Sequence, residues 1–260
     1  FFFHQKKFSA LDTVTKNQRV DAAIFDLGLS SIQLKNLDRG FSFKSKEKLD
    51  MSMGITSISA EKVLNNFSEH SLKTIIKILG EEKDASLIAK NIIKARISKK
   101  ITKVQQLVTI IEKSKRKVYK HKINPCTKTF QALRIFVNKE ITELINGIIN
   151  ATKVLKPGGK ILVVSFHSIE DKIVKYFFNH FSSNRSKPSR YLPDKVEDNF
   201  FLFEKYKNKI ITPSNDEIFK NPPSRSAKLR YAIRSKNQFK YPNELVNRFK
   251  NLIELESINV

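Results

Sequence analysis

The sequence predicts an α/β protein in which a parallel sheet is interrupted by a long all-helical segment. Two largely apolar runs, Ala22–Phe25 and Lys160–Phe166, end abruptly at polar residues, which is typical of strands buried on both faces. Between them, from Ser57 to Lys120, apolar residues recur at three- and four-residue steps, the spacing of an amphipathic helix. Strands that alternate with helices favour a parallel sheet with helical crossover connections.

The first complete strand is predicted over Asp21–Leu27, after the tail of an earlier strand at Phe1–His4 and a short helix that starts at Phe8. Its last polar residue is Asp26. The loop that follows contains side chains that form hydrogen bonds, namely Ser30, Ser31 and Gln33. Ligands of open α/β sheets bind beyond the carboxyl ends of the strands, so we expect Asp26 to contact a small polar ligand. A plain strand-to-loop turn capped by Asp26 explains the same spacing equally well.

The helical segment is predicted to contain three or four helices. One helix has Ser68 as its N-cap and stops at Gly80, because the apolar residues between them occupy positions i, i+3, i+4 and i+7. A later helix follows a capping box formed by Thr102 and Gln105. Basic residues are dense here, which suits either a surface that faces RNA or an ordinary solvated helix face.

The second strand is predicted between two helices. A single long helix runs from Phe130 to Leu155 and is stopped by Pro157–Gly159. The strand Lys160–Phe166 follows, and the next helix is capped by polar residues, namely Ser168, Glu170 and Asp171. His167 is therefore expected at the same sheet edge as Asp26, where two polar groups make a better site than either alone. A purely structural histidine is the alternative.

The last part of the chain is predicted to contain a loop, two edge strands and a tail. Residues Ser182–Asp198 are polar and include two prolines, so we expect a mobile loop near the site. Short strands are predicted at Asn208–Pro213 and Lys228–Arg234. A final amphipathic helix is indicated by apolar residues beyond Lys236, namely Leu245, Phe249 and Leu252.

The chain of 260 residues carries a formal net charge of +24, from 49 basic and 25 acidic residues. A field of that sign concentrates polyanions, so nucleic acid is the first candidate partner. A compositional bias toward lysine explains part of the charge. The arginines inside motifs, Arg39, Arg225 and Arg230, favour selective placement, because a guanidinium group binds phosphate bidentately.

The single cysteine, Cys126, excludes a disulfide within one chain and a cysteine-rich zinc site, so a reducing cytosol is the expected compartment. No apolar run approaches the roughly 20 residues that cross a bilayer. The start, FFFHQKKF, is too soon interrupted by charge to be a signal peptide. The sequence offers no cluster of metal ligands, so no metal is expected.

Six blocks occur in order along the chain: DLGLSS-x-QL, DRGFSF, LDM, TFQALRI, PGGKILVVSFHSIED and RSAKLR. From about Phe8 to Arg234 they resemble the MraW/RsmH family, the small-subunit ribosomal RNA (cytosine-N4) methyltransferases. The resemblance implies a Rossmann-like class I methyltransferase sheet with an inserted all-helical domain. The family's glycine-rich cofactor loop is not in this sequence and is expected upstream of Phe1, so the sheet is expected to be N-terminally incomplete.

The resemblance also implies a division into domains. Residues 1–54 and 146–236 form the methyltransferase domain, and residues 55–145 form an inserted helical domain that recognises the substrate. Residues 237–260 form a C-terminal helical tail outside the resemblance.

The implied reaction is transfer of a methyl group from S-adenosylmethionine to the exocyclic N4 of a cytosine in small-subunit ribosomal RNA, near the decoding centre. The implied partner is that RNA or the assembled small subunit, and the implied location is the cytoplasm. The amine is a poor nucleophile, so the enzyme must present the base out of its stack and align the reacting atoms. An RNA-binding remnant without catalysis is the alternative, because the glycine loop is missing and two family positions, a proline and an arginine, are Ile32 and Ser52 here.

The resemblance assigns roles residue by residue. The implied cofactor contacts are Phe8, which lines an adenine pocket, Asp26 and Gln33. Candidates for the chemistry are Asp26, Ser30, Ser31 and His167, with no residue assigned as general base. The implied RNA contacts are Arg39, Phe41, Phe43, Arg225, Lys228 and Arg230. From the residues alone, anchoring of the loop to the core is the favoured role of the two phenylalanines, and the last three residues suit an edge strand protected by charge.

Overall fold

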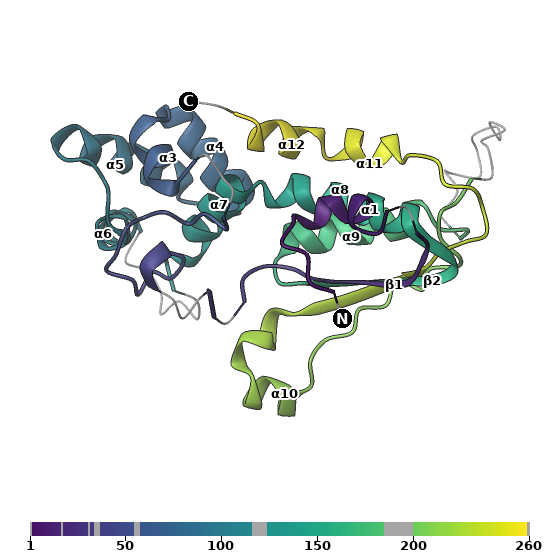
Figure 1. Cartoon of the computed structure of the whole chain (residues 1–260). Coiled ribbons are helices and arrows are strands. Elements are labelled where there is room, and N and C mark those ends of the chain that lie inside the picture. The colour runs from purple at the N-terminus through teal and green to yellow at the C-terminus, as the bar shows by residue number, and fades with distance from the viewer. Residues whose placement is uncertain are drawn as a thin grey trace, which may run out of the picture. The chain divides into compact units, whose positions relative to one another are not determined.

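The structure, a computed structural model of the chain, describes residues 2–16, 18–30, 32–33, 37–54, 58–115, 124–184 and 200–258. The chain forms two compact units (Figure 1). The sheet unit comprises Phe1–Gly28 and Glu143–Lys250, and the helical unit comprises Leu29–Thr142 and Asn251–Val260.

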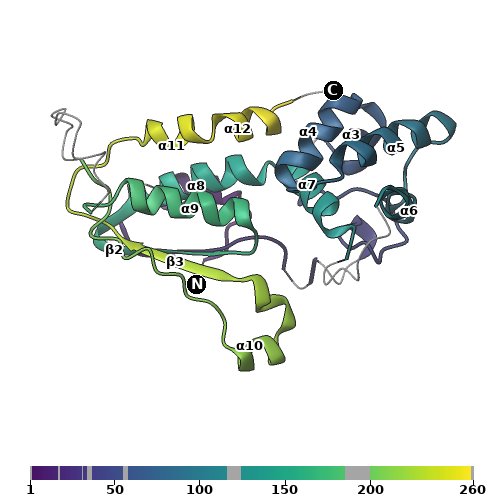
Figure 2. The ribbon, with the colours of Figure 1, turned by 180° about the vertical axis from the view of Figure 1, so that it is seen from behind.

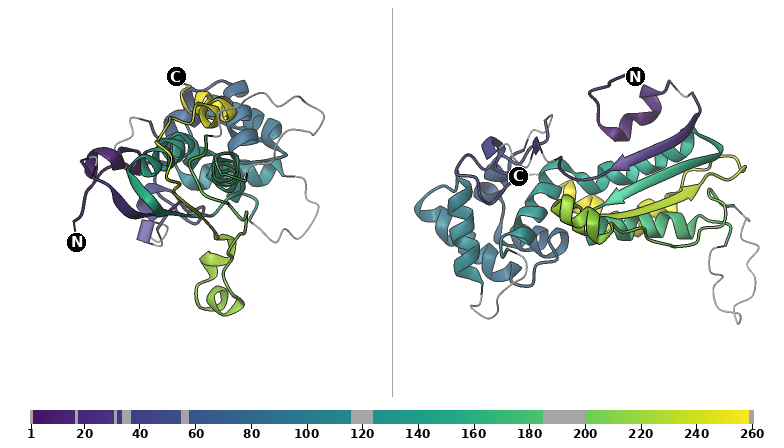
Figure 3. Two further views of the ribbon diagram at one scale, coloured as in Figure 1. Left: turned by 90° about the vertical axis from the view of Figure 1, so that its right-hand side faces the viewer. Right: turned by 90° about the horizontal axis from the view of Figure 1, so that it is seen from below.

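Three strands form the sheet in the order β1-β2-β3. Strand β1 (Val20–Asp26) is parallel to β2 (Leu155–Ser165), and β3 (Lys228–Ile233) is antiparallel to β2. Helix α8 (Glu140–Val154) leads into β2 and α9 (Ser168–His180) follows it, and both helices lie on one face of the sheet (Figure 3). A parallel pair of strands with helices before and after the second strand confirms the predicted α/β class.

Strand β1 buries one face only, so the prediction that it is buried on both faces is wrong. Ala23 and Phe25 are buried, whereas Ile24 between them is 73% exposed. An alternation with a period of two residues is the pattern of a strand with one covered face.

The segment Pro157–Gly159 was expected to form a turn before the second strand, but it lies inside β2. A register shift between Val20 and Ala22 accommodates this segment as an irregularity in the ladder.

The predicted long helix from Phe130 to Leu155 consists of two helices. Helix α7 (Thr127–Asn138) ends where Lys139 adopts the left-handed conformation, with φ of 53° and ψ of 42°, and α8 begins at the next residue. Lys139 is exposed, so its side chain does not cause the break. The contacts that hold the break belong to the neighbouring residues Asn138 and Ile141.

The helical unit contains α3 (Ala60–Asn66), α4 (Glu69–Leu79), α5 (Ala85–Ser98) and α6 (Val104–Ser114), together with α7 (Figure 2). These four helices, α3 to α6, lie within the described residues 58–115 and confirm the predicted helical segment. The Oγ of Ser68 accepts from the backbone N of Ser71, and Gly80 ends α4, as predicted. The predicted capping box is displaced by one residue, because the Gln106 Oε1 accepts from the backbone N of Thr102 and of Lys103.

The remaining segments differ from the predictions in detail. A 3-10 helix at Phe8–Ala10 and α1 (Leu11–Val14) confirm the first short helix, but residues 2–4 form no strand. Most of the predicted loop Ser182–Asp198 lies outside the described residues. The segment Asn208–Pro213 contributes a single antiparallel bridge, between Ile211 and Leu229, rather than a strand. The tail forms two short helices, α11 (Asn243–Arg248) and α12 (Lys250–Glu256), instead of one.

Packing groups residues 29–54 with the helices, although the sequence assigns them to the sheet domain. The division between the two units falls within α8, after Thr142. The assignment of residues 55–145 to substrate recognition is a functional statement and stays a prediction. None of the described helices is long and apolar enough to span a membrane.

Candidate functional site at the sheet edge

The ends of β1 and β2 lie side by side in the sheet unit. Asp26, the last residue of β1, pairs with Val164, and the backbone N of Leu27 donates to the carbonyl O of Val164 at 3.1 Å. Gly28 follows with φ of 90°, and a Cβ there would meet the ring of Phe166 at 3.6 Å. The first residues after both strands therefore share one edge. The Asp26 side chain is exposed there, and no partner for it is found among the described residues.

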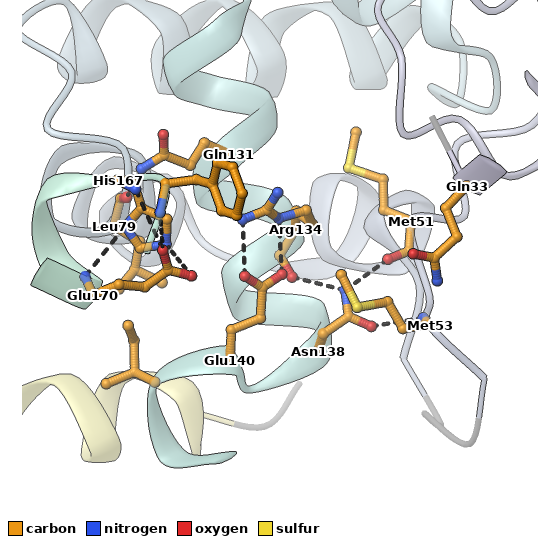
Figure 4. Close-up of polar contacts among 12 residues, drawn as sticks. Gln33, Met51, Met53, Leu79, Gln131, Arg134, Asn138, Glu140, His167 and Glu170 are labelled. Atoms are coloured by element: carbon orange, nitrogen blue, oxygen red, sulfur yellow. Dashed lines mark hydrogen bonds and ion pairs between the residues drawn. The ribbon is translucent and has the colours of Figure 1, made fainter. Parts of the chain in front are cut away.

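His167 caps the helix that follows β2. Its Nδ1 accepts from the backbone N of Glu170 at 3.4 Å, while the Glu170 Oε2 accepts from the backbone N of Phe166 at 2.9 Å and of His167 at 3.3 Å (Figure 4). These reciprocal bonds form a capping box, so the N-cap is His167 and not Ser168 as predicted. The His167 side chain is only 7% exposed, and its Nε2 lies 3.1 Å from the Glu170 Oε1. This geometry supports a structural histidine that fixes the sheet edge.

In the same unit, Phe8 packs against β1 and α8. Its ring makes an edge-on contact with Phe25, with centroids 5.8 Å apart, and 40% of Phe8 is exposed. Gly147 on α8 makes room for this ring, because a Cβ there would lie 2.6 Å from the Phe8 Cδ2. Part of the Phe8 ring is therefore exposed, while its edge-on contact with the buried Phe25 supports it.

Ser30 and Gln33 bind each other in the helical unit. The backbone N of Ser30 donates to the Gln33 Oε1 at 2.9 Å, and the backbone N of Gln33 donates to the Ser30 Oγ at 3.2 Å. These two bonds fix the orientation of both side chains. Ser31, another predicted site residue, lies outside the described residues.

The Arg39-Gly-Phe-Ser-Phe block is anchored to the helical unit by its aromatic residues. Phe41 is 7% exposed, and Phe43 packs edge-on against Phe130 with centroids 6.3 Å apart. Arg39 is exposed, and its NH1 donates to the carbonyl O of Ser52 at 3.4 Å. The conformation therefore favours anchoring for Phe41 and leaves the Arg39 guanidinium at the surface.

Asn138, which sequence reasoning missed, holds the turn after this block. Its Nδ2 donates to the carbonyl O of Met51 at 2.8 Å, and its Oδ1 accepts from the backbone N of Met53 at 2.7 Å (Figure 4). Met51 is buried and has a backbone φ of 58°, which residues other than glycine, asparagine and aspartate rarely adopt. The signal in the sequence was Asn138 at the end of an apolar helix, where a buried amide needs partners.

Gln131 and Arg134 also bond within the helical unit. The Gln131 Nε2 donates to the carbonyl O of Leu79 at 3.3 Å, and the Arg134 Nε lies 2.8 Å from the Glu140 Oε1 (Figure 4). The pair Arg134–Glu140 spans the break between α7 and α8. Both side chains thus serve the helical packing of their own unit.

The RSAKLR block divides into an anchored and an exposed part. Arg230 is 2% exposed, and its guanidinium group donates to both carboxylate oxygens of Asp171, to the Tyr206 hydroxyl and to the Asn208 Oδ1. All three guanidinium nitrogens are therefore engaged, so Arg230 does not offer the free phosphate-binding group that the sequence predicted. Lys228 keeps 41% of its side chain exposed, 3.5 Å from Asp171, and Arg225 is exposed.

Burial and neighbouring charges shift the pKa of two groups, the Cys126 thiol and the Asp171 carboxyl. Burial raises the pKa of the Cys126 thiol to about 11, so this cysteine is not a nucleophile at neutral pH. Burial also raises the pKa of Asp171, but the hydrogen bond and charge of Arg230 outweigh that effect and lower it. Asp171 is therefore an ionised partner of Arg230.

An open α/β sheet with a carboxylate at the end of one parallel strand, beside a capped helix that follows the next, defines a class of α/β proteins that bind ligands at the carboxyl edge of the sheet. Comparison with known proteins narrows this class. The sequence model of the MraW methylase family matches residues 1–235. The chain belongs to the MraW methylase family, which confirms the resemblance of its six blocks and places its sheet among the Rossmann-like methyltransferase folds.

Curated relatives support this assignment. A protein of Bartonella bacilliformis named ribosomal RNA small subunit methyltransferase H is 46% identical over 231 residues, which cover 89% of this chain and 69% of the relative. Proteins with the same name from Ehrlichia canis and Sinorhizobium fredii are 44% and 42% identical. The alignments cover 89% and 88% of this chain and 76% and 67% of those relatives.

Proposed function

We propose that this protein is an S-adenosylmethionine-dependent methyltransferase that modifies the exocyclic N4 of a cytosine in small-subunit ribosomal RNA, near the decoding centre. Membership of the MraW methylase family and the names of its relatives support methyl transfer to that RNA. The observation that carries the proposal is Asp26, an exposed carboxylate at the end of β1, beside the end of β2.

Three residues are proposed as cofactor contacts. The part of the Phe8 ring that remains exposed is suited to stacking on an adenine, while its contact with Phe25 fixes the ring plane. Asp26 is suited to accept hydrogen bonds from hydroxyl or amine groups, since its carboxylate has four acceptor positions. Gln33 is proposed from its place in the DLGLSS-x-QL block, and its bond with Ser30 fixes its orientation.

The chemistry requires alignment more than it requires acid or base strength. When bound, the cofactor supplies an activated methyl group that passes to the amine nitrogen. The lone pair of that nitrogen is delocalised into the cytosine ring, so holding nitrogen and methyl in line supplies most of the rate enhancement. Asp26 or Ser30 can hold the amine by accepting its N–H groups, and His167 acts as a positioning residue that keeps the helix after β2 capped.

The partner is proposed to be RNA, either free or in the small subunit. The net charge of +24 steers the chain toward a polyanion and makes binding dependent on salt. Arg39, Arg225 and Lys228 are the proposed phosphate contacts, since each reaches the surface. Phe41 and Phe43 are proposed to support Arg39 rather than to stack on a base in the described conformation. We place the reaction in the cytoplasm, where this RNA is processed.

Calorimetry with S-adenosylmethionine tests the proposal, combined with transfer of a labelled methyl group to small-subunit RNA. We expect Asp26→Ala to abolish measurable cofactor binding and transfer. The matched control is Asp21→Ala, because Asp21 lies on the same strand and its carboxylate pairs only with the exposed Lys156 among the described residues. RNA binding by the wild-type chain with neither cofactor binding nor methyl transfer would contradict the proposal.

A further inference from the structure

An arm at Asn208–Ala227 leaves the sheet unit and returns to it. It contains α10 (Asn215–Lys220) and a 3-10 helix (Pro222–Ser226), and both Figure 1 and Figure 2 show it running away from the strands. The Oγ of Ser214 caps α10 by accepting from the backbone N of Glu217 at 3.1 Å. The arm thus has its own local structure, although little of it is buried.

The two ends of the arm are fixed to each other. The backbone N of Ile211 donates to the carbonyl O of Leu229 at 3.0 Å, and the reverse bond measures 2.9 Å. Arg230 donates to the Asn208 Oδ1 at 3.1 Å while it binds Asp171 on α9. The backbone bonds and the buried Arg230 network therefore fix the base of the arm on the sheet unit.

The tip carries an aromatic side chain with almost no protein contact. Phe219 on α10 is 87% exposed, and among the described aromatic side chains only Phe2 is more exposed. Ile210 and Ile211, nearer the sheet, are 36% and 46% exposed. An exposed phenylalanine leaves its apolar surface in water, so a partner that covers the ring gains free energy from its burial.

The arm that carries this aromatic residue also carries three positive side chains. Lys209, Lys220 and Arg225 are exposed and have no ion-pair partner among the described residues. The acidic residues of the arm, Asp216 and Glu217, lie in the first turn of α10, where they favour the helix itself. An exposed ring flanked by unpaired cations is the combination that binds a base and its phosphates together.

We propose that the arm Asn208–Ala227 is an RNA-contacting element in which Phe219 stacks on an unpaired base while Lys220 and Arg225 bind the adjacent phosphates. The proposal rests on the proposed function only in taking RNA as the partner. A protein partner fits less well, since a stable protein interface buries about 800 Å² on each side. One phenylalanine supplies only about 150–250 Å².

Substitution of Phe219 tests the stacking directly, because an exposed side chain can be changed without loss of the fold. With a labelled single-stranded RNA containing unpaired cytosines as the probe, we expect Phe219→Ala and Phe219→Leu to weaken binding by about 5- to 150-fold, the usual effect of losing one stacked base. Phe3→Ala is the matched control, since Phe3 is 80% exposed, and it should bind as the wild type does. Full binding by Phe219→Leu would show that apolar bulk suffices and would overturn the stacking.

A fluorescent variant provides a second and independent measurement. The chain contains no tryptophan, so Phe219→Trp introduces a single reporter. We expect the RNA probe to quench its emission on binding with affinity close to that of the wild type, and to leave Phe3→Trp unchanged. Equal quenching of both variants, or quenching of neither, would overturn the proposal and favour a protein contact for Phe219.

The outcome is separable from that for methyl transfer. If the wild type binds no cofactor but Phe219→Ala still weakens RNA binding, the proposed enzyme fails and the arm stands. If the wild type methylates RNA and Phe219→Ala binds and methylates equally well, the arm fails and the enzyme stands.

Discussion

The guanidinium group of Arg230 binds the carboxylate of Asp171 through two hydrogen bonds, Nε to Oδ1 at 2.7 Å and NH2 to Oδ2 at 3.2 Å. Arg230 lies on β3 and Asp171 lies on α9, so the pair ties the edge strand to a helix that covers the sheet. Arg230 also donates to Tyr206 and Asn208, which secures the start of the arm.

Breaking this pair from one side is expected to destabilise the sheet unit strongly. Asp171→Asn leaves the buried guanidinium without a charged partner, and we expect the free energy of unfolding to fall by about 3–5 kcal/mol. Because Arg230 lowers the pKa of Asp171 overall, the pair's contribution is present above the ordinary aspartate pKa and is lost as the pH falls through the lowered value. Urea denaturation at several pH values measures both effects.

The control for this prediction is Arg225→Ala in the same sequence block. Arg225 is exposed, so no measurable change in stability is expected. Arg230→Lys should resemble Asp171→Asn in direction, because lysine cannot form the bidentate contact. If Asp171→Asn proved as stable as the wild type, the contact between Asp171 and Arg230 would not be formed in solution.

Glu256 caps the start of α8 from the tail. Its Oε1 accepts from the backbone N of Ile141 at 2.9 Å, and its Oε2 accepts from the backbone N and hydroxyl of Thr142 at 2.8 and 2.6 Å. Burial raises the pKa of this carboxyl to about 7, although the hydrogen bonds with Thr142 and Ile141 oppose the shift. Since the folded pKa lies above that of the unfolded chain, ionisation costs stability as the pH rises from about 4.5 to about 7.

We expect this residue to make the helical unit less stable at neutral than at mildly acidic pH. The loss between pH 4.5 and 7 amounts to about 3 kcal/mol, since one pKa unit is about 1.4 kcal/mol. Glu256→Gln removes the charge, so its stability should vary less with pH than that of the wild type. Its NH2 group replaces one of the two acceptor oxygens, so a loss of stability that does not depend on pH is also expected. Parallel pH profiles of unfolding check this, and identical profiles for the two proteins would refute it.

Asn138 is expected to control the conformation of the turn at Met51. Asn138→Ala removes the acceptor of the Met53 backbone N and one donor to the Met51 carbonyl, so we expect a loss of about 1–3 kcal/mol in stability. Hydrogen exchange of the Met53 amide should accelerate. Asn91→Ala is the control, because Asn91 donates to the Ser114 Oγ in the same unit. That variant should leave Met53 protected, and unchanged exchange in Asn138→Ala would contradict the assignment.

The sequence predicts local structure well where one segment determines it. The end of β1 at Asp26 and the cap at Ser68 follow from short-range patterns, and the structure has both. The break at Lys139 was not predictable in this way, because the apolar spacing continues through it and lysine is a good helix former. Bonds from Met51, Met53 and Glu256, far away in sequence, hold the residues on either side.

The same limit applies to the candidate site. Lys228 and Arg230 are two residues apart on a strand and look equivalent in the sequence, yet one is partly exposed and the other is buried. The difference arises from Asp171, 59 residues earlier, whose charge allows an arginine to be buried. His167 was placed at the correct edge, but its partner Glu170 makes it a cap. Phe219 carried no recognisable motif, and only its exposure in the folded chain singles it out.

Gly147 is expected to tune the proposed adenine contact without weakening the fold. A Cβ at this position would lie 2.6 Å from the Phe8 Cδ2 and 3.2 Å from the Phe25 Cε1, so Gly147→Ala must displace the ring of Phe8. Phe8 is 40% exposed and can move outward, and alanine favours a helix over glycine by about 1 kcal/mol. We therefore expect unchanged or slightly higher stability together with weaker binding of S-adenosylmethionine.

A double-mutant cycle isolates this steric effect from any other consequence of Gly147→Ala. Once Phe8→Ala has removed the ring, the added methyl group still meets the Phe25 Cε1, at 3.2 Å, but it no longer displaces an adenine contact. The double variant should therefore bind the cofactor no more weakly than Phe8→Ala alone. Calorimetry of the four proteins supplies the affinities, and thermal unfolding supplies the stabilities. If Gly147→Ala weakened binding by the same factor with and without Phe8, the ring would not be the route of the effect. The contact between Gly147 and Phe8 would then have no part in holding the cofactor.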